Sequence, residues 1–228
     1  MSSSTTYEGV LTVEEAAAEV RSILQGAPAG EPLDEQTARL LELAVRACGT
    51  TLDLPGTTTQ LRAALDAGVT GEQVQEMLVL VAGIGIHALI ATSTLVATEL
   101  RERGHPAMAA GFDDRQTAVW NRIGGGDERE ARIAAIAPDF LPNLVRLSPE
   151  ETVVGVVDFR AAPWFGTTLS ALQKELIGIA VDTMPSHRFL PTLRIHAKRA
   201  RELGAGTTMI DEVLAISAAA PEHPGVRG

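Results

Sequence analysis

The sequence is poor in cysteine, in aromatic residues and in basic residues. The single cysteine among its 228 residues, Cys48, excludes an internal disulfide framework, an all-cysteine zinc site and a redox centre built from two thiols of one chain. Two Trp, one Tyr and five Phe leave a core of Ala, Leu, Val and Ile, which favours packed helices over a β-sandwich. The net charge of -10 argues against a general nucleic-acid or anionic-membrane partner.

Two segments of the sequence bear on export and membrane insertion. The N-terminal stretch Met1–Tyr7 has no basic region followed by an apolar core, so we expect no signal peptide and a cytoplasmic location. Met77–Thr98 contains no Asp, Glu, Lys or Arg and is long enough to cross a bilayer. Because Gly83 and Gly85 interrupt it, we interpret it as two buried helices that meet at these glycines, with no membrane partner.

An internal repeat is present. The stretch 33–78 aligns with 169–214 without a gap, and the identical positions include a Leu-Pro pair (Leu54-Pro55 and Leu190-Pro191) and a glycine (Gly68 and Gly204). Capping-box patterns begin the predicted helices, and these glycines end them. The pattern predicts an all-α chain built from two copies of one helical unit, divided into 1–110 and 111–228.

The repeated unit resembles the carboxymuconolactone decarboxylase family, which includes alkylhydroperoxidase-D-like proteins. The resemblance is carried by 59–70 (TQLRAALDAGVT), by 73–79 (QVQEMLV) and by the helix 172–180 (LQKELIGIA). The stretch from Gly111 through Trp164 is similar to the lead-in of a full decarboxylase-type domain. The resemblance implies a tandem all-α fold and an oligomer, for which we expect a homotrimer of fused chains.

Peroxidase-type members of this family carry Cys-x-x-Cys-x-x-x-His at the start of the second helix of the unit. The matching frames here are 53–60 (DLPGTTTQ) and 189–196 (FLPTLRIH), which lack both cysteines, and only the second keeps its histidine, His196. Dithiol peroxidase chemistry requires an attacking and a resolving thiol, so it is excluded. Both copies are also slightly longer than the family spacing before the histidine position.

His196 is the leading candidate for chemistry. At 100° per residue it lies at the edge of a small-residue stripe formed by Leu193, Ala197, Ala200 and Gly204, where an imidazole can act as a general acid or base. A structural histidine bonded to a neighbouring helix is the alternative. Glu175 matches the family glutamate of a proton relay, which makes it a partner for His196, or else a solvated helix carboxylate; its counterpart in the first copy is Arg39.

A basic stretch surrounds this histidine. Between Thr183 and Arg201 there is no acidic residue, but there are five Lys and Arg of the chain's 19. One interpretation is a pocket for a carboxylate or enolate with Arg188 or Arg194 as the anion clamp. The other is a surface that pairs with acidic residues of the other repeat or of another subunit. The further candidates for substrate binding are His187, His87 and Trp164. Five histidines without metal-like spacing predict no metal site.

These features predict a cofactor-independent lyase or isomerase that uses acid–base chemistry on a small anionic lactone or β-keto substrate. Decarboxylation is the reaction that the family resemblance implies. Two alternatives stay open: a recruited cyclase or dehydratase of a biosynthetic pathway, and a non-catalytic oligomeric binding protein whose site has decayed, as Arg39 and Gln60 in the first copy suggest.

Overall fold

The computed structural model describes residues 10–109, 111–125, 131 and 134–226. By their contacts, the described residues form two compact units. The larger unit comprises residues 10–84 and 163–226, and the other comprises the described residues between 85 and 162. These units follow contacts in space, whereas the division into 1–110 and 111–228 follows the sequence repeat and stays a prediction.

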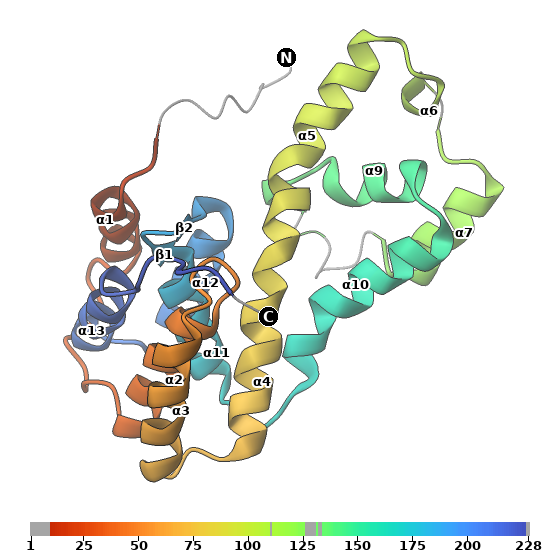
Figure 1. Ribbon diagram of the computed structural model, residues 1–228. Helices are drawn as coiled ribbons and strands as arrows, with labels where there is room; N and C mark the ends of the chain where they lie inside the picture. The colour runs from red at the N-terminus through yellow and green to blue at the C-terminus, as the bar shows by residue number, and fades with distance from the viewer. Residues whose placement is uncertain (1–9, 110, 126–130, 132–133, 227–228) are drawn as a thin grey trace. The chain divides into compact units, whose positions relative to one another are not determined.

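The larger unit is helical apart from one short hairpin (Figure 1). Its helices and strands, in chain order, are α1 (Val13–Ile23), α2 (Glu35–Ala47), α3 (Leu54–Asp66), α4 (Gly71–Ala82), α11 (Ala171–Asp182), β1 (Thr183–Met184), β2 (His187–Arg188), α12 (Leu190–Glu202) and α13 (Thr207–Ala218). The two short strands pair antiparallel around Pro185-Ser186. The all-α fold class predicted from the sequence is confirmed.

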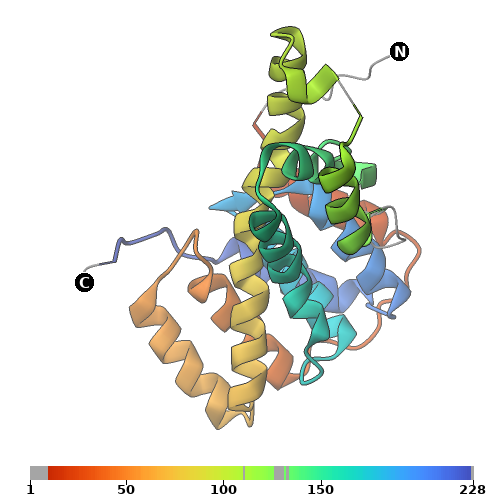
Figure 2. The same ribbon diagram turned by 90° about the vertical axis from the view of Figure 1, so that its right-hand side faces the viewer.

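The helices of this unit pack around α2 and α11. Helix α2 packs against α3, α4 and α13, and α11 packs against α12, α13 and α4. The orange α2 and α3 lie side by side in both views (Figures 1 and 2). The largest core residues are aliphatic, among them Leu40, Leu41, Leu43, Leu176, Ile177 and Ile179, all at most 1% exposed. Burial of these side chains removes apolar surface from water and so stabilises the unit.

The helix boundaries repeat with the same spacing in the two halves of this unit. Helices α2, α3 and α4 begin at positions 35, 54 and 71, and α11, α12 and α13 begin at positions 171, 190 and 207. Each of the three pairs of starts thus has the offset that aligns 33–78 with 169–214. The residues after α3 and α12 include Gly68 and Gly204, whose φ angles of 88° and 93° allow the chain to leave each helix. The phase of the Leu-Pro pairs and of these glycines in the sequence therefore corresponds to the helix starts and ends.

The other unit contains α5 (His87–Glu102), α6 (Pro106–Ala109), α7 (Asp114–Arg122), α9 (Phe140–Leu147) and α10 (Glu150–Phe165), whose last residues belong to the larger unit. Helix α9 packs against α5 and α7. Asn143 Nδ2 donates a hydrogen bond of 2.7 Å to the Ser93 carbonyl, and Arg101 pairs with Asp139 at 2.6 Å. These contacts join α9 and the residue before it to α5.

The apolar stretch from Met77 to Thr98 forms two helices, α4 and α5, joined by the 3-10 turn Gly83–Ile86, as predicted at its glycines. The expectation that both are buried was wrong. The helical run Gly71–Glu102 is long and apolar enough to cross a membrane by length and composition, and 22% of its most apolar window is buried. The physical reason is that apolar residues of α5 lie on more than one face, so Leu89, Leu95 and Val96 are exposed while Ile90 is buried.

Candidate active site

A histidine and a glutamate from adjacent helices form a buried pair in the larger unit. Nδ1 of His196, on α12, lies 2.7 Å from Oε2 of Glu175, on α11. The side chains are 15% and 8% exposed. Since the carboxylate accepts a hydrogen bond from Nδ1–H, Nε2 is the nitrogen left to exchange a proton with another molecule. The arrangement is that of a histidine oriented for general acid–base chemistry.

Local structure sets the approach of the two helices. Ser170 caps α11 in a capping box with Gln173, and Pro191 lies in the first turn of α12. The ring of His196 rests directly on the backbone of α11 at Gly178, where an added Cβ would come within 2.7 Å of two ring carbons. Only glycine at this position lets the imidazole lie so close to the helix that carries Glu175.

The indole of Trp164 lies over the imidazole of His196. The two ring centroids are 6.2 Å apart and the planes differ by 21°, an offset parallel arrangement. Trp164 itself is 46% exposed. It therefore covers one side of the histidine and reaches solvent with its other side.

Burial and charge act in opposite directions on His196. Burial alone would lower its pKa, because the charged imidazolium is desolvated. The hydrogen bond to Glu175 and the negative charges of Asp182 and Glu175 act the other way and outweigh it. The pKa of His196 is therefore raised above its ordinary value of 6.5, which keeps a protonated imidazole available close to neutral pH.

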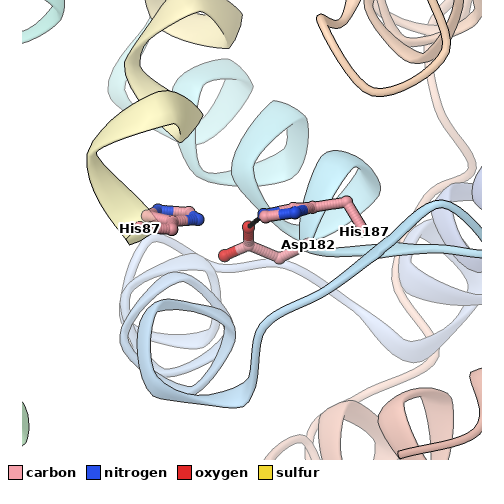
Figure 3. A group of neighbouring side chains, drawn as sticks. All are labelled: His87, Asp182 and His187. Atoms are coloured by element: carbon pink, nitrogen blue, oxygen red, sulfur yellow. Dashed lines mark ion pairs between the residues drawn. The ribbon is translucent and has the colours of Figure 1, made fainter. Parts of the chain in front are cut away.

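A second histidine and carboxylate lie at the carboxyl end of α11. Asp182 is 1% exposed and accepts a hydrogen bond of 2.6 Å from Thr192 Oγ1 on α12. Its Oδ1 lies 3.4 Å from Nε2 of His187 on β2, and the dashed line in Figure 3 marks this pair. A carboxylate oxygen and an imidazole nitrogen are ligand types that divalent metal ions accept. The negative charge of Asp182 also acts on His196 and raises its pKa.

The basic stretch is engaged in several separate contacts. Arg194 Nε donates to Glu19 on α1 at 2.7 Å, Arg199 pairs with Glu202, and Arg201 donates to the Ile23 carbonyl. Arg188 is partly exposed and donates to the Pro185 carbonyl at 2.5 Å, within the hairpin that carries it. Of these four cations, Arg194 pairs with an acidic residue of the other half of the chain and Arg201 contacts a backbone carbonyl there. The contacts of Arg199 and Arg188 are local.

The structure brings His196, Glu175 and Trp164 together, and it places His187 beside Asp182. Arg194 is directed to Glu19 instead. His87 is the first residue of α5 and belongs to the other unit. Three residues near the pair were missed at the level of sequence: Asp182, Thr192 and Gly178.

The positions of 33–78 that align with the pair differ in charge and contact. Arg39 aligns with Glu175, and Gln60 aligns with His196. Arg39 pairs with Glu42 at 2.9 Å on the surface of α2. The stretch 33–78 therefore has no carboxylate–imidazole pair at these positions.

The chain matches no protein-family model and no curated protein to a significant degree. Among solved structures it is similar to a protein from Burkholderia xenovorans provisionally named a gamma-carboxymuconolactone decarboxylase subunit. The two share 26% sequence identity, with a TM-score of 0.66, over 91% of this chain and 90% of that chain. The fold is of the carboxymuconolactone decarboxylase type. The similarity in fold extends over nearly the full length of both chains, in agreement with the resemblance found in the sequence.

Proposed function

We propose that the protein is a cofactor-independent enzyme that catalyses acid–base chemistry at a carbon–carbon bond, as a lyase or isomerase. The observation that carries this proposal is the buried pair of His196 and Glu175, with Nε2 left to exchange a proton. The decarboxylase-like fold supports the choice of decarboxylation as the leading reaction. The substrate is a small anion, a lactone carboxylate or a β-keto acid.

The reaction balances with His196 alone as the proton donor. The bond between the carboxylate carbon and the neighbouring carbon breaks, CO₂ leaves, and the electron pair enters the adjacent carbonyl or unsaturated system as an enolate. Imidazolium Nε2–H of His196 then donates its proton to carbon, and the neutral ring regains one from water while Glu175 holds Nδ1. In an isomerase reaction the neutral ring would instead remove a proton from one carbon and return it to another.

Arg188 is the better of the two candidates for the anion clamp. Arg194 has a carboxylate partner, Glu19, at 2.7 Å, which offsets its charge. The contact of Arg188 with the Pro185 carbonyl is to a neutral group, and no carboxylate among the described residues pairs with its positive charge. Its guanidinium could therefore bind a substrate carboxylate through two parallel hydrogen bonds.

We also propose that the chain is a tandem of two homologous copies, divided near residue 110, with the working site in the second. Two observations support this. The lead-in to each copy is held by the other copy's third helix, since Leu169 N donates to Glu76 and Leu33 N donates to Glu212. Residues at equivalent positions also bond to each other: Thr50 to Ser186, and Gln173 to Thr37. Such reciprocal contacts are those of a two-fold dimer.

Exposed apolar side chains on the smaller unit support self-association of the chain. Leu89, Leu95, Val96 and Phe159, which belong to the smaller unit, are all more than 40% exposed, and burial against further copies of the chain would remove this apolar surface from water. We propose a homo-oligomer, with a trimer as the leading assembly, in the cytoplasm and without nucleic-acid or membrane partners.

The proposed activity is tested with a set of β-keto acids and lactone carboxylates in D₂O, by following CO₂ release and deuterium incorporation by NMR. The wild type is expected to release CO₂ and place deuterium on the carbon that lost it. His196→Gln, which copies the residue of the first copy, is expected to lose turnover by two or more orders of magnitude, on the order of 10²–10⁴-fold. The matched control, Gln60→Ala, should retain it. Ring closure or loss of water without CO₂ would favour the cyclase or dehydratase instead, and unchanged turnover in His196→Gln would contradict the mechanism.

A further inference from the structure

A buried ion pair outside the His196–Glu175 pair holds the segment that carries Trp164. Lys174 and Glu76 lie 2.7 Å apart, and their side chains are 6% and 9% exposed. Lys174 comes from α11, directly before Glu175, and Glu76 comes from α4. We refer to the residues that this pair contacts, Pro163–Leu169, as the lead-in segment.

The contacts to the lead-in segment use both members of the ion pair. Nζ of Lys174 donates to the carbonyl of Pro163 at 3.0 Å and to that of Gly166 at 2.6 Å, on either side of Trp164. The Glu76 carboxylate accepts from the backbone N–H and the hydroxyl of Thr168 and from the N–H of Leu169. The ammonium therefore fixes the first half of the segment and the carboxylate fixes the second half.

Gly166 shows how closely the segment follows this pair. A Cβ at Gly166 would overlap the carboxyl group of Glu76, so a side chain there must displace one or the other. The carboxylate itself is held in its charged form. Burial would raise the pKa of Glu76, but Lys174 and the donors of Thr168 and Leu169 outweigh this and lower it to about 2.

We propose that Lys174 and Glu76 are positioning residues for the active site: they fix the lead-in segment so that the indole of Trp164 stays over His196. Lys174 and Glu175 are neighbours on α11, and each controls one side of the histidine. Lys174 holds the backbone on either side of Trp164 and so fixes the position of the indole. Glu175 fixes the orientation of the imidazole through its hydrogen bond with Nδ1. This role rests on the proposed function for its catalytic meaning, but the geometry can be measured without a substrate.

Trp164 emission reports this geometry. In a Trp120→Phe background, Trp164 is the only tryptophan of the chain. An imidazolium in contact with an indole quenches its fluorescence, because it accepts an electron from the excited ring. Emission should therefore fall as the pH is lowered through the titration of His196. The additional change His196→Gln should abolish this pH dependence, and its persistence would overturn the proposal.

Glu76→Gln and Lys174→Met are expected to lose most of the pH-dependent quenching while the far-ultraviolet circular dichroism shows the helices intact. Gly166→Ala keeps both charges and displaces the lead-in segment, so it tests the same contact if a charge variant fails to fold. The matched control is Glu212→Gln, because Glu212 holds Leu33 N in the other copy, where the residue corresponding to Trp164 is Pro28. Glu212→Gln should show the same pH-dependent quenching of Trp164 as the Trp120→Phe protein.

Two further results would overturn the inference: unchanged quenching in Glu76→Gln and in Gly166→Ala, or equal loss in Glu212→Gln. Failure of the proposed function can be told apart from failure of this inference. In that case the Trp120→Phe protein would show no turnover in the NMR assay but would keep the pH-dependent quenching of Trp164. Where turnover is present, the folded Glu76→Gln variant should have a lower kcat.

Discussion

Nδ1 of His196 and Oε2 of Glu175 lie 2.7 Å apart between α12 and α11, two helices that only the short β-hairpin separates along the chain. The carboxylate is nearly buried, so it retains its effect on the imidazole with little screening by solvent. This contact fixes which ring nitrogen is available, and it raises the pKa of the ring against the effect of burial.

Glu175→Gln is expected to lower the pKa of His196, because it removes a charged acceptor and leaves the desolvation in place. Titration of the histidine Cε1–H signals by NMR measures the change, with His196→Gln identifying the resonance. The matched control is Glu202→Gln on α12, whose partner Arg199 is on the surface. An identical titration midpoint of His196 in Glu175→Gln and wild type would show that Glu175 does not raise its pKa.

The same pair gives stability a pH dependence. A group whose pKa is raised by folding stabilises the folded protein fully below its ordinary pKa, here 6.5, and this contribution is lost as the pH rises through the folded pKa. The free energy of unfolding of the wild type should therefore decrease as the pH rises from 6.5 through the folded pKa of His196. Urea titrations at a series of pH values measure this decrease. Glu175→Gln should show a smaller dependence, and an equal slope in both proteins would argue against it.

Gly178→Ala is expected to destabilise the protein by about 2 kcal/mol, since its Cβ would overlap the ring of His196 and force the two helices or the ring to shift. Urea unfolding measures the loss, and the His196 titration should move with it. Gly155→Ala on α10 is the control, because nothing lies within 4 Å of its Cβ and alanine favours a helix by up to about 1 kcal/mol. Equal effects at the two positions would contradict the close approach at Gly178.

The ion pair of Glu76 and Lys174 predicts acid sensitivity. The pKa of Glu76 falls from 4.5 to about 2 on folding, so its contribution is present above 4.5 and is lost as the pH falls toward 2. Glu76→Gln should cost about 3 kcal/mol at neutral pH, because the buried ammonium of Lys174 loses its partner. Acid unfolding curves should then be flatter below pH 4.5 than in wild type.

The exposed pair of Arg21 and Asp211 provides the control, with Asp211→Asn expected to change stability by less than about 1 kcal/mol. If Glu76→Gln cost no more than this control, the buried pair would hold the lead-in segment only weakly.

Sequence reasoning predicted the parts of this molecule that depend on local pattern. Helix starts follow from capping residues and Leu-Pro pairs, and helix ends follow from Gly68 and Gly204, because these residue types restrict the backbone at their own positions. His196 was identifiable from its place on the stripe of α12. That Glu175 meets it follows from the family pattern, and the structure supplies the distance.

The remaining features depend on contacts between distant parts of the chain. Nothing in the sequence near Glu76 indicates its partners, because Thr168 and Lys174 lie more than 90 residues further along the chain. Gly178 is indistinguishable from any other helix residue in the sequence, since nothing near it indicates that an imidazole packs against it. The strands of the hairpin were also too short to leave a periodic signal.

The most direct test of the central claim compares two titrations of one protein. The pH dependence of kcat/KM for a turned-over β-keto acid or lactone carboxylate is measured beside the NMR titration of His196 in the free enzyme. We predict that the kinetic midpoint coincides with that of His196 and that both move down together in Glu175→Gln. A rate that stays constant while His196 titrates, or a kinetic midpoint that Glu175→Gln leaves in place, would contradict it.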